Sequence, residues 1–185
     1  DDRLYLHRYF DYERRLARRL VQARHAGAPA GAPAPDSPAL RARLAELFAA
    51  NAARLDGGAD WQRLAAALAL RGRLTVISGG PGTGKTTTVV NLLACLLALA
   101  PDGRIALAAP TGKAAARMTD AIRQRARHLP PDLRDRMPAT ASTVHRLLGA
   151  SPAGFVHDAD PPLPIDALVV DEASMLDLAL ATRLL

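Results

Sequence analysis

Residues 79–86 read G-G-P-G-T-G-K-T, which matches the spacing G-x-x-x-x-G-K-T from Gly79 to Thr86. Glycines at these places let a loop wrap closely around a phosphate chain, with backbone N–H groups pointing inward. In such a loop Lys85 reaches the β- and γ-phosphates, and the Thr86 hydroxyl ligates Mg²⁺. The spacing therefore predicts a site for ATP and Mg²⁺. The predicted loop residues are Gly79, Gly80, Pro81, Gly82, Thr83, Gly84, Lys85, Thr86 and Thr87.

A pair of carboxylates follows an apolar stretch near the other end of the chain. Residues 165–170 read I-D-A-L-V-V and predict a strand, and Asp171 and Glu172 come directly after it. Asp171 at a strand tip is placed to hold Mg²⁺ through its water shell, and Glu172 to orient or deprotonate an attacking water. The alternative, a strand followed by an acidic helix cap, is common by itself. The loop at Gly79 favours catalysis, which requires Lys85, Asp171 and Glu172 to converge on one triphosphate.

A third polar segment, Pro110, Thr111, Gly112 and Lys113, follows the predicted core strand 104–109 and precedes a predicted helix over 114–128. A threonine hydroxyl, glycine N–H groups and a lysine at a helix N-terminus suit contact with a nucleic-acid phosphate backbone. The alternative is an ordinary strand-to-helix connection with a solvated basic face. Of the 24 basic residues, only Lys85 and Lys113 are lysines, and the other 22 are arginines. Because this chain otherwise uses arginine for its basic surface, the choice of lysine at these two positions favours a specific role for both.

The elements around these residues predict the fold. A short β-branched strand over 74–77 precedes the glycine loop, and an apolar helix that starts near Lys85 and includes 89–99 follows it. Strands followed by helices give right-handed crossovers and a parallel sheet covered on both faces, with ligand beyond the carboxyl ends of the strands. We therefore predict an α/β domain with a parallel sheet in three αβα layers, preceded by a small helical domain.

The remaining stretches supply boundaries. A helix over 4–21 carries Leu6, Tyr9, Phe10, Leu16 and Leu20 near one face. This helix belongs either to a small helical domain or to a docking surface for a partner chain. The other expected features are a Pro/Ala-rich linker at 26–38, a helix over 38–55, a helix over 61–70 capped by Asp60, a loop over 129–138, a helix within 141–149 capped by Ser142 or Thr143, and either a short excursion or a hairpin around 155–156. The predicted domains are 1–56 and 57–185.

The bulk composition limits the class of protein. A net charge of +6 over 185 residues makes a polyanionic partner plausible. Cys95 is the single cysteine, and its apolar surroundings predict a buried core residue. A chain without an internal disulfide fits a reducing cytoplasm. No targeting sequence or membrane span is visible, and the chain has the look of a piece of a longer protein.

Five segments together resemble one family. They are LYLHRYFDYERRLA at 4–17, SGGPGTGKTTTV at 78–89, APTGKAAARM at 109–118, ASTVHRLLG at 141–149 and LVVDEASMLD at 168–177. The last four resemble, in order, the first motifs of superfamily 1 DNA helicases. The residues within these motifs are most similar to those of the RecD family, to which the alpha subunit of the exonuclease V complex RecBCD belongs.

The resemblance implies a RecA-like P-loop α/β domain, which this chain would contain without its C-terminal part. It implies an ATP-driven motor that moves 5′ to 3′ on single-stranded DNA and acts in double-strand break repair and recombination. It implies that Gln62 contacts adenine and that the 110–113 segment binds the DNA backbone. Ser142, Thr143, His145 and Arg146 would lie along the same DNA channel. The N-terminal helix would dock on the RecB- and RecC-like chains of the complex.

Superfamily 1 helicases also need a second RecA-like domain with an arginine finger, so the 185-residue chain alone is expected to bind nucleotide weakly at best and not to unwind DNA. Three alternatives stay open: a stand-alone RecD-like helicase, a P-loop ATPase that uses ATP as a conformational switch, and a module that acts mainly in assembly.

Overall fold

The computed structural model describes residues 6–26, 37–55, 57–80, 82–152, 154–156 and 162–185. The chain divides into two compact units, each described by itself below. The first comprises Asp1–Gln22, Arg104–Asp120 and Pro138–Leu185, and the second Ala23–Gly103 and Ala121–Met137. Within the described ranges, no helix combines the length and the apolar character needed to cross a membrane.

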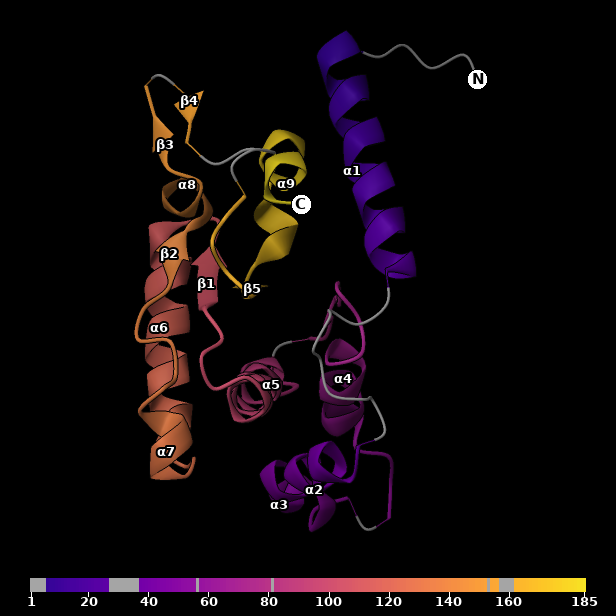
Figure 1. The fold of residues 1–185 in the computed structure, drawn as a ribbon, viewed down its shortest axis with the longest axis vertical. Coiled ribbons are helices and arrows are strands. Elements are labelled where there is room, and N and C mark those ends of the chain that lie inside the picture. The colour runs from indigo at the N-terminus through magenta and orange to yellow at the C-terminus, as the bar shows by residue number, and fades with distance from the viewer. Residues whose placement is uncertain (1–5, 27–36, 56, 81, 153, 157–161) are drawn as a thin grey trace. The chain divides into compact units, whose positions relative to one another are not determined.

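A three-stranded parallel sheet forms the centre of the first unit. Strand β1 (Ile105–Ala109) lies between β2 (Ser142–Thr143) and β5 (Ala167–Val170). The predicted parallel α/β class is confirmed. Side chains from β1, α8 (Val144–Leu147) and α9 (Leu178–Leu184) share a core. In the view of Figure 1, β1 and β5 are seen between α6 (Gly112–Ala126) and α9. The short helix η1 (Ala173–Met175) connects β5 to α9.

One ion pair marks the start of the sheet. The backbone N–H and the Nε of Arg104 both donate to Asp166 Oδ2, at 2.7 and 3.3 Å. The backbone N–H of Arg104, and then its guanidinium, lower the pKa of the Asp166 carboxyl. Asp166 precedes β5 and Arg104 precedes β1, so the contact joins the strands where their pairing begins, at Ile105 and Ala167.

The predicted hairpin is confirmed as β3 (Ala150–Ser151) paired antiparallel with β4 (Gly154–Phe155). Gly149 enters it at φ 66°, and a Cβ there would lie 2.8 Å from the Cβ of Val156. Both observations explain why the helix before it ends in glycine. The sequence predicted only a helix over 141–149. The structure adds β2, because Ser142 and Thr143 pair with Ala108 and Ala109 before α8 starts.

The N-terminal helix α1 (His7–His25) also belongs to this unit as far as Gln22 and buries none of its side chains. The Thr182 hydroxyl of α9 donates to the carbonyl of Tyr12 at 3.2 Å. Among the apolar residues predicted to share one face, Leu6 is 73% exposed and Tyr9 46% exposed. The helix therefore presents apolar side chains to solvent.

Helices make up the second unit. They are α2 (Pro38–Leu47), α3 (Ala49–Ala52), α4 (Trp61–Ala69), α5 (Lys85–Leu99), the end of α6, and α7 (Pro131–Arg134). Local signals set several helix starts. Ser37 Oγ accepts from Leu40 N, and Asp60 Oδ1 accepts from the N–H groups of Gln62 and Arg63. The predicted loop over 129–138 is corrected by α7, which begins at a proline, where the missing N–H costs no helical hydrogen bond.

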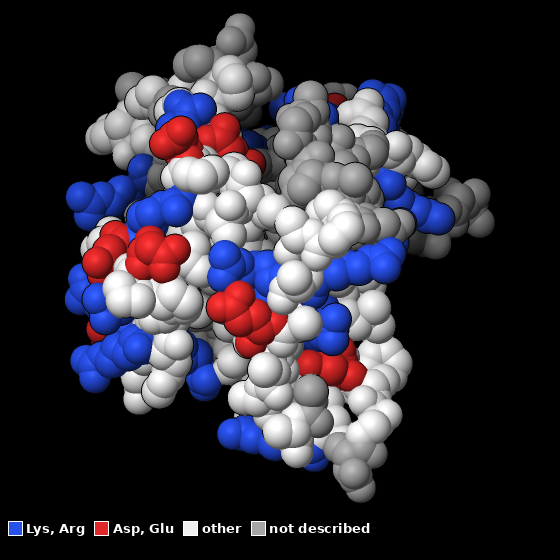
Figure 2. Space-filling model, turned by 60° about the horizontal axis from the view of Figure 1, so that its bottom comes forward, with Lys and Arg blue, Asp and Glu red and all other residues white. Residues whose placement is uncertain are grey.

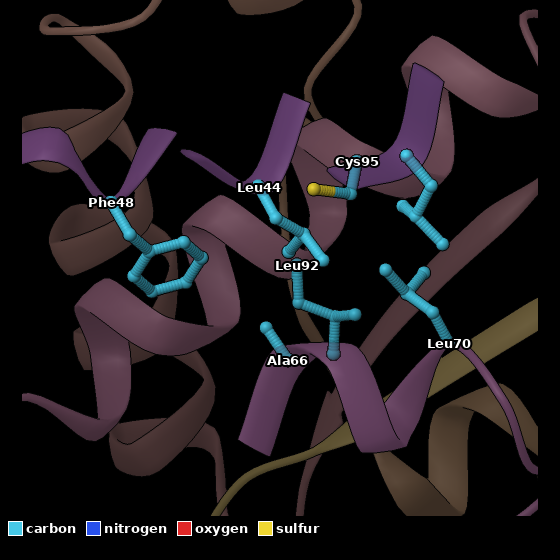
Figure 3. Packing of buried hydrophobic residues seen from close by; sticks show 7 residues of the cluster. Leu44, Phe48, Ala66, Leu70, Leu92 and Cys95 are labelled. Atoms are coloured by element: carbon cyan, nitrogen blue, oxygen red, sulfur yellow. The ribbon is translucent and has the colours of Figure 1, made fainter. Parts of the chain in front are cut away.

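The core of the second unit joins α2, α4 and α5. Leu44, Phe48, Ala66, Leu92 and Cys95 are all buried in one cluster, and Figure 3 shows their side chains turned toward one another. At the other end of α5, the Arg136 guanidinium donates to the carbonyls of Leu97 and Pro101 at 2.6 and 2.7 Å. A cation on the last carbonyls of a helix complements its dipole.

The predicted continuous helix over 38–55 is wrong at Phe48. This residue has φ −108° and ψ 12°, so α2 ends there and α3 begins after it. Phe48 is 2% exposed, and Asn51 just beyond it hydrogen bonds to Asp60 and Gln62. Tertiary packing therefore overrides the local helix propensity of this alanine-rich stretch.

The predicted buried strand over 74–77 is also wrong, because the structure gives this segment no strand and leaves Val76 84% exposed. β-branched residues favour a strand only where a neighbouring strand completes the hydrogen-bond ladder and buries the side chains. The predicted linker at 26–38 falls almost entirely outside the described residues, as do the first two residues of the predicted helix over 4–21 and Pro81.

Cys95 should be inert toward thiol reagents in the folded chain. Its side chain is fully buried, and burial raises the pKa of its thiol to about 11. The thiolate is the reactive form, so the reaction should be slow at pH 7 and remain slow up to about pH 9. Ellman titration should find one thiol in denaturant and almost none in native chain. A Cys95→Ala chain provides the blank, and rapid native labelling at pH 7 would contradict the burial.

Candidate functional site: a phosphate loop and an acidic sheet edge

The phosphate loop precedes α5 in the second unit. Gly82 and Gly84 have φ of 75° and 81°, and Gly84 is the residue immediately before the helix. Such left-handed conformations are accessible to glycine without strain. The helix begins at Lys85, as predicted, so its positive N-terminal end faces the loop. The glycine pattern therefore has a local structural cause as well as a chemical one.

Lys85 folds back onto its own loop. Its Nζ donates to the carbonyls of Gly79 and Gly80 at 2.5 and 2.8 Å, and Thr83 Oγ1 donates to the Gly80 carbonyl at 2.9 Å. Two loop carbonyls thus accept hydrogen bonds from the ammonium group. Phosphate oxygens are stronger acceptors of the same kind, so this donor fits a triphosphate chain.

Gln62 lies against this loop although it comes 21 residues before Thr83 in sequence. Its Nε2 donates to the Thr83 carbonyl at 2.9 Å, and its Oε1 accepts from Asn51 Nδ2 at 2.9 Å. The structure therefore places Gln62 at the loop. Sequence reasoning did not identify Asn51, because a single asparagine at a helix end carries no motif.

The first turn of α5 contains Thr86 and Thr87, both half-buried. Arg125 Nη1 of α6 approaches Thr87 Oγ1 to 2.5 Å. Arg125 was predicted only as part of a basic helix face. The structure adds that this guanidinium touches the helix that begins with Lys85.

The acidic pair lies in the first unit at the end of β5. The N–H of Asp171 donates to the Ala108 carbonyl of β1 at 3.0 Å, which continues the sheet pairing by one residue. Asp171 Oδ1 accepts from the N–H of Glu172 at 2.9 Å, and both side chains are exposed. Glu172 has φ 53°, the one positive value among the described non-glycine residues. This strained conformation turns the chain sharply out of the sheet and sits at a candidate catalytic residue.

The two predicted DNA segments meet the acidic pair at the same edge of the sheet. Ala109 pairs with Thr143, and Ala108 pairs with both Ser142 and Val170. The carboxyl ends of β1, β2 and β5 are therefore in register. The segments that leave this edge begin with Pro110, Val144 and Asp171. Parallel strands bring residues from distant parts of a chain together in this way.

Hydroxyl groups organise the starts of the helices at this edge. Thr111 Oγ1 accepts from Ala114 N, and Thr143 Oγ1 accepts from Arg146 N, both at 3.2 Å. A hydroxyl that accepts in a cap can still donate its own hydrogen to a ligand. Lys113, His145 and Arg146 are exposed. The His145 ring lies 6.2 Å from that of Phe155 of the hairpin.

The predicted site residues thus form two groups. Gln62 and the loop residues through Thr87 lie in the second unit, apart from Pro81, which is outside the described residues. The 110–113 segment, Thr143, His145, Arg146 and the acidic pair lie in the first. Convergence of Lys85 with Asp171 and Glu172 stays a prediction. Figure 2 shows Lys and Arg side chains interspersed with Asp and Glu on the visible face. The charge distribution on this face therefore does not by itself indicate where DNA would bind.

Comparison with known proteins places the chain in a family. The model of a family described as "AAA domain" matches residues 62–185. RecBCD enzyme subunit RecD of Mycobacterium tuberculosis is 45% identical over 192 residues, covering 100% of this chain and 31% of the relative. The Mycolicibacterium smegmatis subunit of the same name is 45% identical over 198 residues, covering 100% of this chain and 32% of the relative.

A further relative is the ATP-dependent RecD2 DNA helicase of Deinococcus radiodurans, which is 43% identical over 113 residues, covering 61% of this chain and 13% of that protein. The chain spans about a third of the length of the mycobacterial relatives. The resemblance to RecD proteins is therefore confirmed. The chain belongs to the AAA domain family, whose P-loop binds nucleotide.

Proposed function

We propose that the intact protein is an ATP-dependent 5′–3′ DNA helicase subunit of an exonuclease V complex, acting in double-strand break repair and recombination in the cytoplasm. The observation that carries the proposal is the shared sheet edge, where the 110–113 segment, the 143–146 segment and the acidic pair follow neighbouring parallel strands. Two mycobacterial relatives named as RecBCD subunits match the whole chain and support it. Residues 1–56 would form the N-terminal helical domain, and 57–185 part of the first motor domain.

In this proposal the phosphate loop binds ATP. Lys85 exchanges the carbonyls of Gly79 and Gly80 for the β- and γ-phosphate oxygens, and Gln62 contacts adenine. Thr86 and Asp171 would hold Mg²⁺. The ion, when bound, neutralises charge on the phosphate oxygens. Glu172 orients the attacking water and takes its proton.

DNA would bind at the sheet edge. Pro110, Thr111, Gly112 and Lys113 contact the backbone of single-stranded DNA, through N–H groups at the start of α6 and the lysine ammonium. Thr143, His145 and Arg146 extend this contact along the next strand. Duplex DNA is the substrate that the motor separates. The proximity of these segments to Asp171 and Glu172 gives DNA a direct route to influence hydrolysis.

The exposed apolar face of α1 would dock on the RecB- and RecC-like chains. Leu6, Tyr9 and Phe10 are exposed in this chain. A partner chain that covers them would remove their apolar surface from water, which stabilises a complex. A truncated form of the intact protein that lacks residues 1–25 should therefore keep ATP hydrolysis and lose capture by its partners.

Lys113→Gln in the intact protein tests the DNA assignment. We expect single-stranded DNA to stimulate ATP hydrolysis by the wild type, and Lys113→Gln to raise the DNA concentration for half-maximal stimulation several-fold, because one phosphate contact is lost. The dependence of DNA affinity on salt should become shallower by about one unit of log–log slope. Arg54→Gln, an exposed charge change outside the proposed interface, is the control. Hydrolysis indifferent to DNA would favour a P-loop switch instead.

A second candidate is a helicase that works without partner subunits. The Deinococcus relative named ATP-dependent RecD2 DNA helicase supports it. Unwinding by the purified intact protein alone, unchanged when residues 1–25 are removed, would favour this interpretation over the complex-bound form.

A further inference from the structure

Asn51 is the start of a hydrogen-bond chain that ends in the phosphate loop. Its Nδ2 donates to Gln62 Oε1 at 2.9 Å and to Asp60 Oδ1 at 3.2 Å. Asp60 Oδ1 also accepts the N–H groups of Gln62 and Arg63. Asp60 Oδ2 is buried, and the described residues give it no hydrogen-bond partner. Three donors therefore gather on one carboxylate oxygen, which holds the Asn51 amide in place.

This arrangement fixes which way the Gln62 amide points. Asn51 presents N–H to Oε1, and the Thr83 carbonyl can only accept, so Nε2 must face Thr83. A flipped amide would set two donors against each other at Asn51 and two acceptors against each other at Thr83. Neither contact could be repaired by a small movement, since each end of the amide would meet the wrong partner.

The fixed amide in turn supports the loop. Thr83 precedes Gly84, which has φ 81° and leads directly into the helix that carries Lys85. A Cβ at Gly84 would collide with the Gln62 amide nitrogen. Gln62 therefore packs against the peptide that turns the chain from the loop into α5.

The orientation also has the polarity that adenine requires. Beyond these two bonds, the Gln62 amide has a second lone pair on Oε1 and a second hydrogen on Nε2. The corresponding edge of adenine offers an N6 amino donor and an N7 acceptor, whereas guanine offers acceptors at both places. A Gln62 amide held as it is here matches adenine at both atoms and opposes guanine O6 with an oxygen.

We propose that Asn51 is a positioning residue that acts through Gln62, both holding the phosphate loop and setting the selectivity for ATP over GTP. The inference rests on the proposed contact between Gln62 and adenine. It adds a residue that lies on a different helix and touches neither phosphate nor base.

The test compares equilibrium binding of ATP and GTP by the intact protein and its variants, using titration calorimetry. Asn51→Leu removes the donor, and Asn51→Asp keeps the shape while replacing the donor with an acceptor. Both should weaken ATP binding by about two- to tenfold, the loss of one hydrogen bond, and GTP binding by less. The ratio of the affinity for ATP to the affinity for GTP should therefore fall. Asn91→Leu is the control, because the Asn91 side chain donates, among the described residues, to the Leu47 carbonyl and not to the loop.

A double-mutant cycle separates positioning from general stability. If Asn51 acts through Gln62, Asn51→Leu should have almost no further effect on ATP binding in a Gln62→Leu background. An additive loss in that background, or a selectivity unchanged by both Asn51 variants, would overturn the inference. A wild type that never prefers ATP over GTP would overturn the adenine assignment of Gln62 as well, whereas DNA-independent hydrolysis would overturn the helicase proposal and leave the Asn51 result standing.

Discussion

Replacing Lys85 with glutamine in the intact protein should reduce the rate of ATP hydrolysis by a factor on the order of 10² to 10³. The ammonium is the one charged donor that the loop itself supplies, and the structure shows it already bound by the carbonyls of Gly79 and Gly80. Glutamine cannot neutralise phosphate charge, and its uncharged amide is a weaker hydrogen-bond donor than the lysine ammonium. Steady-state hydrolysis and ATP affinity should be measured together, and both should fall.

Lys113→Gln provides the matched control for this result. It removes the other lysine, which also lies in a glycine-containing turn at the start of a helix. We expect ATP affinity without DNA to be unchanged in Lys113→Gln. Near-normal turnover in Lys85→Gln would contradict the assignment of this loop as the nucleotide site, whatever the DNA results.

Glu172→Gln should lower the hydrolysis rate by about 10²- to 10⁴-fold while leaving ATP binding nearly intact. Glutamine has the same shape but cannot accept a proton from water. The free energy of unfolding should also stay the same, because both residues carry the same backbone strain at φ 53°. Single-turnover hydrolysis and ATP titration separate the lost step from the retained affinity.

Glu172→Gly makes this prediction specific to the structure. Glycine adopts the left-handed conformation without strain, so this variant should be as inactive as Glu172→Gln and more stable by about 1 kcal/mol. Chemical denaturation would measure the gain. Glu13→Gln on α1, an exposed carboxylate change, is the control for both assays. Hydrolysis retained in Glu172→Gln would remove this residue from the catalytic role, and an unstable Glu172→Gly would show that the conformation is not strained.

Many of the local features could be predicted from the sequence because their causes lie within a few residues. The helix starting at Lys85, the Asp60 and Thr143 caps and the order of strand, turn and helix around Pro110 follow from spacing and capping chemistry. The apolar runs at 104–109 and 165–170 also predicted parallel strands, which the structure begins one and two residues later. Their register, which aligns the polar segments at one edge, came from the structure.

What the sequence by itself determined is the chemistry available to this chain: a lysine in a glycine loop, two carboxylates after a strand, and a basic turn. Only the tertiary structure broke the helix at Phe48, left 74–77 without strand pairing, and brought Asn51 and Gln62 to Thr83. The physical reason is distance along the chain. Caps and turns are made by neighbours in sequence, whereas the hydrogen bonds from Asn51 to Gln62 and from Gln62 to Thr83 span 11 and 21 residues and form only after α3, α4 and the loop have packed together.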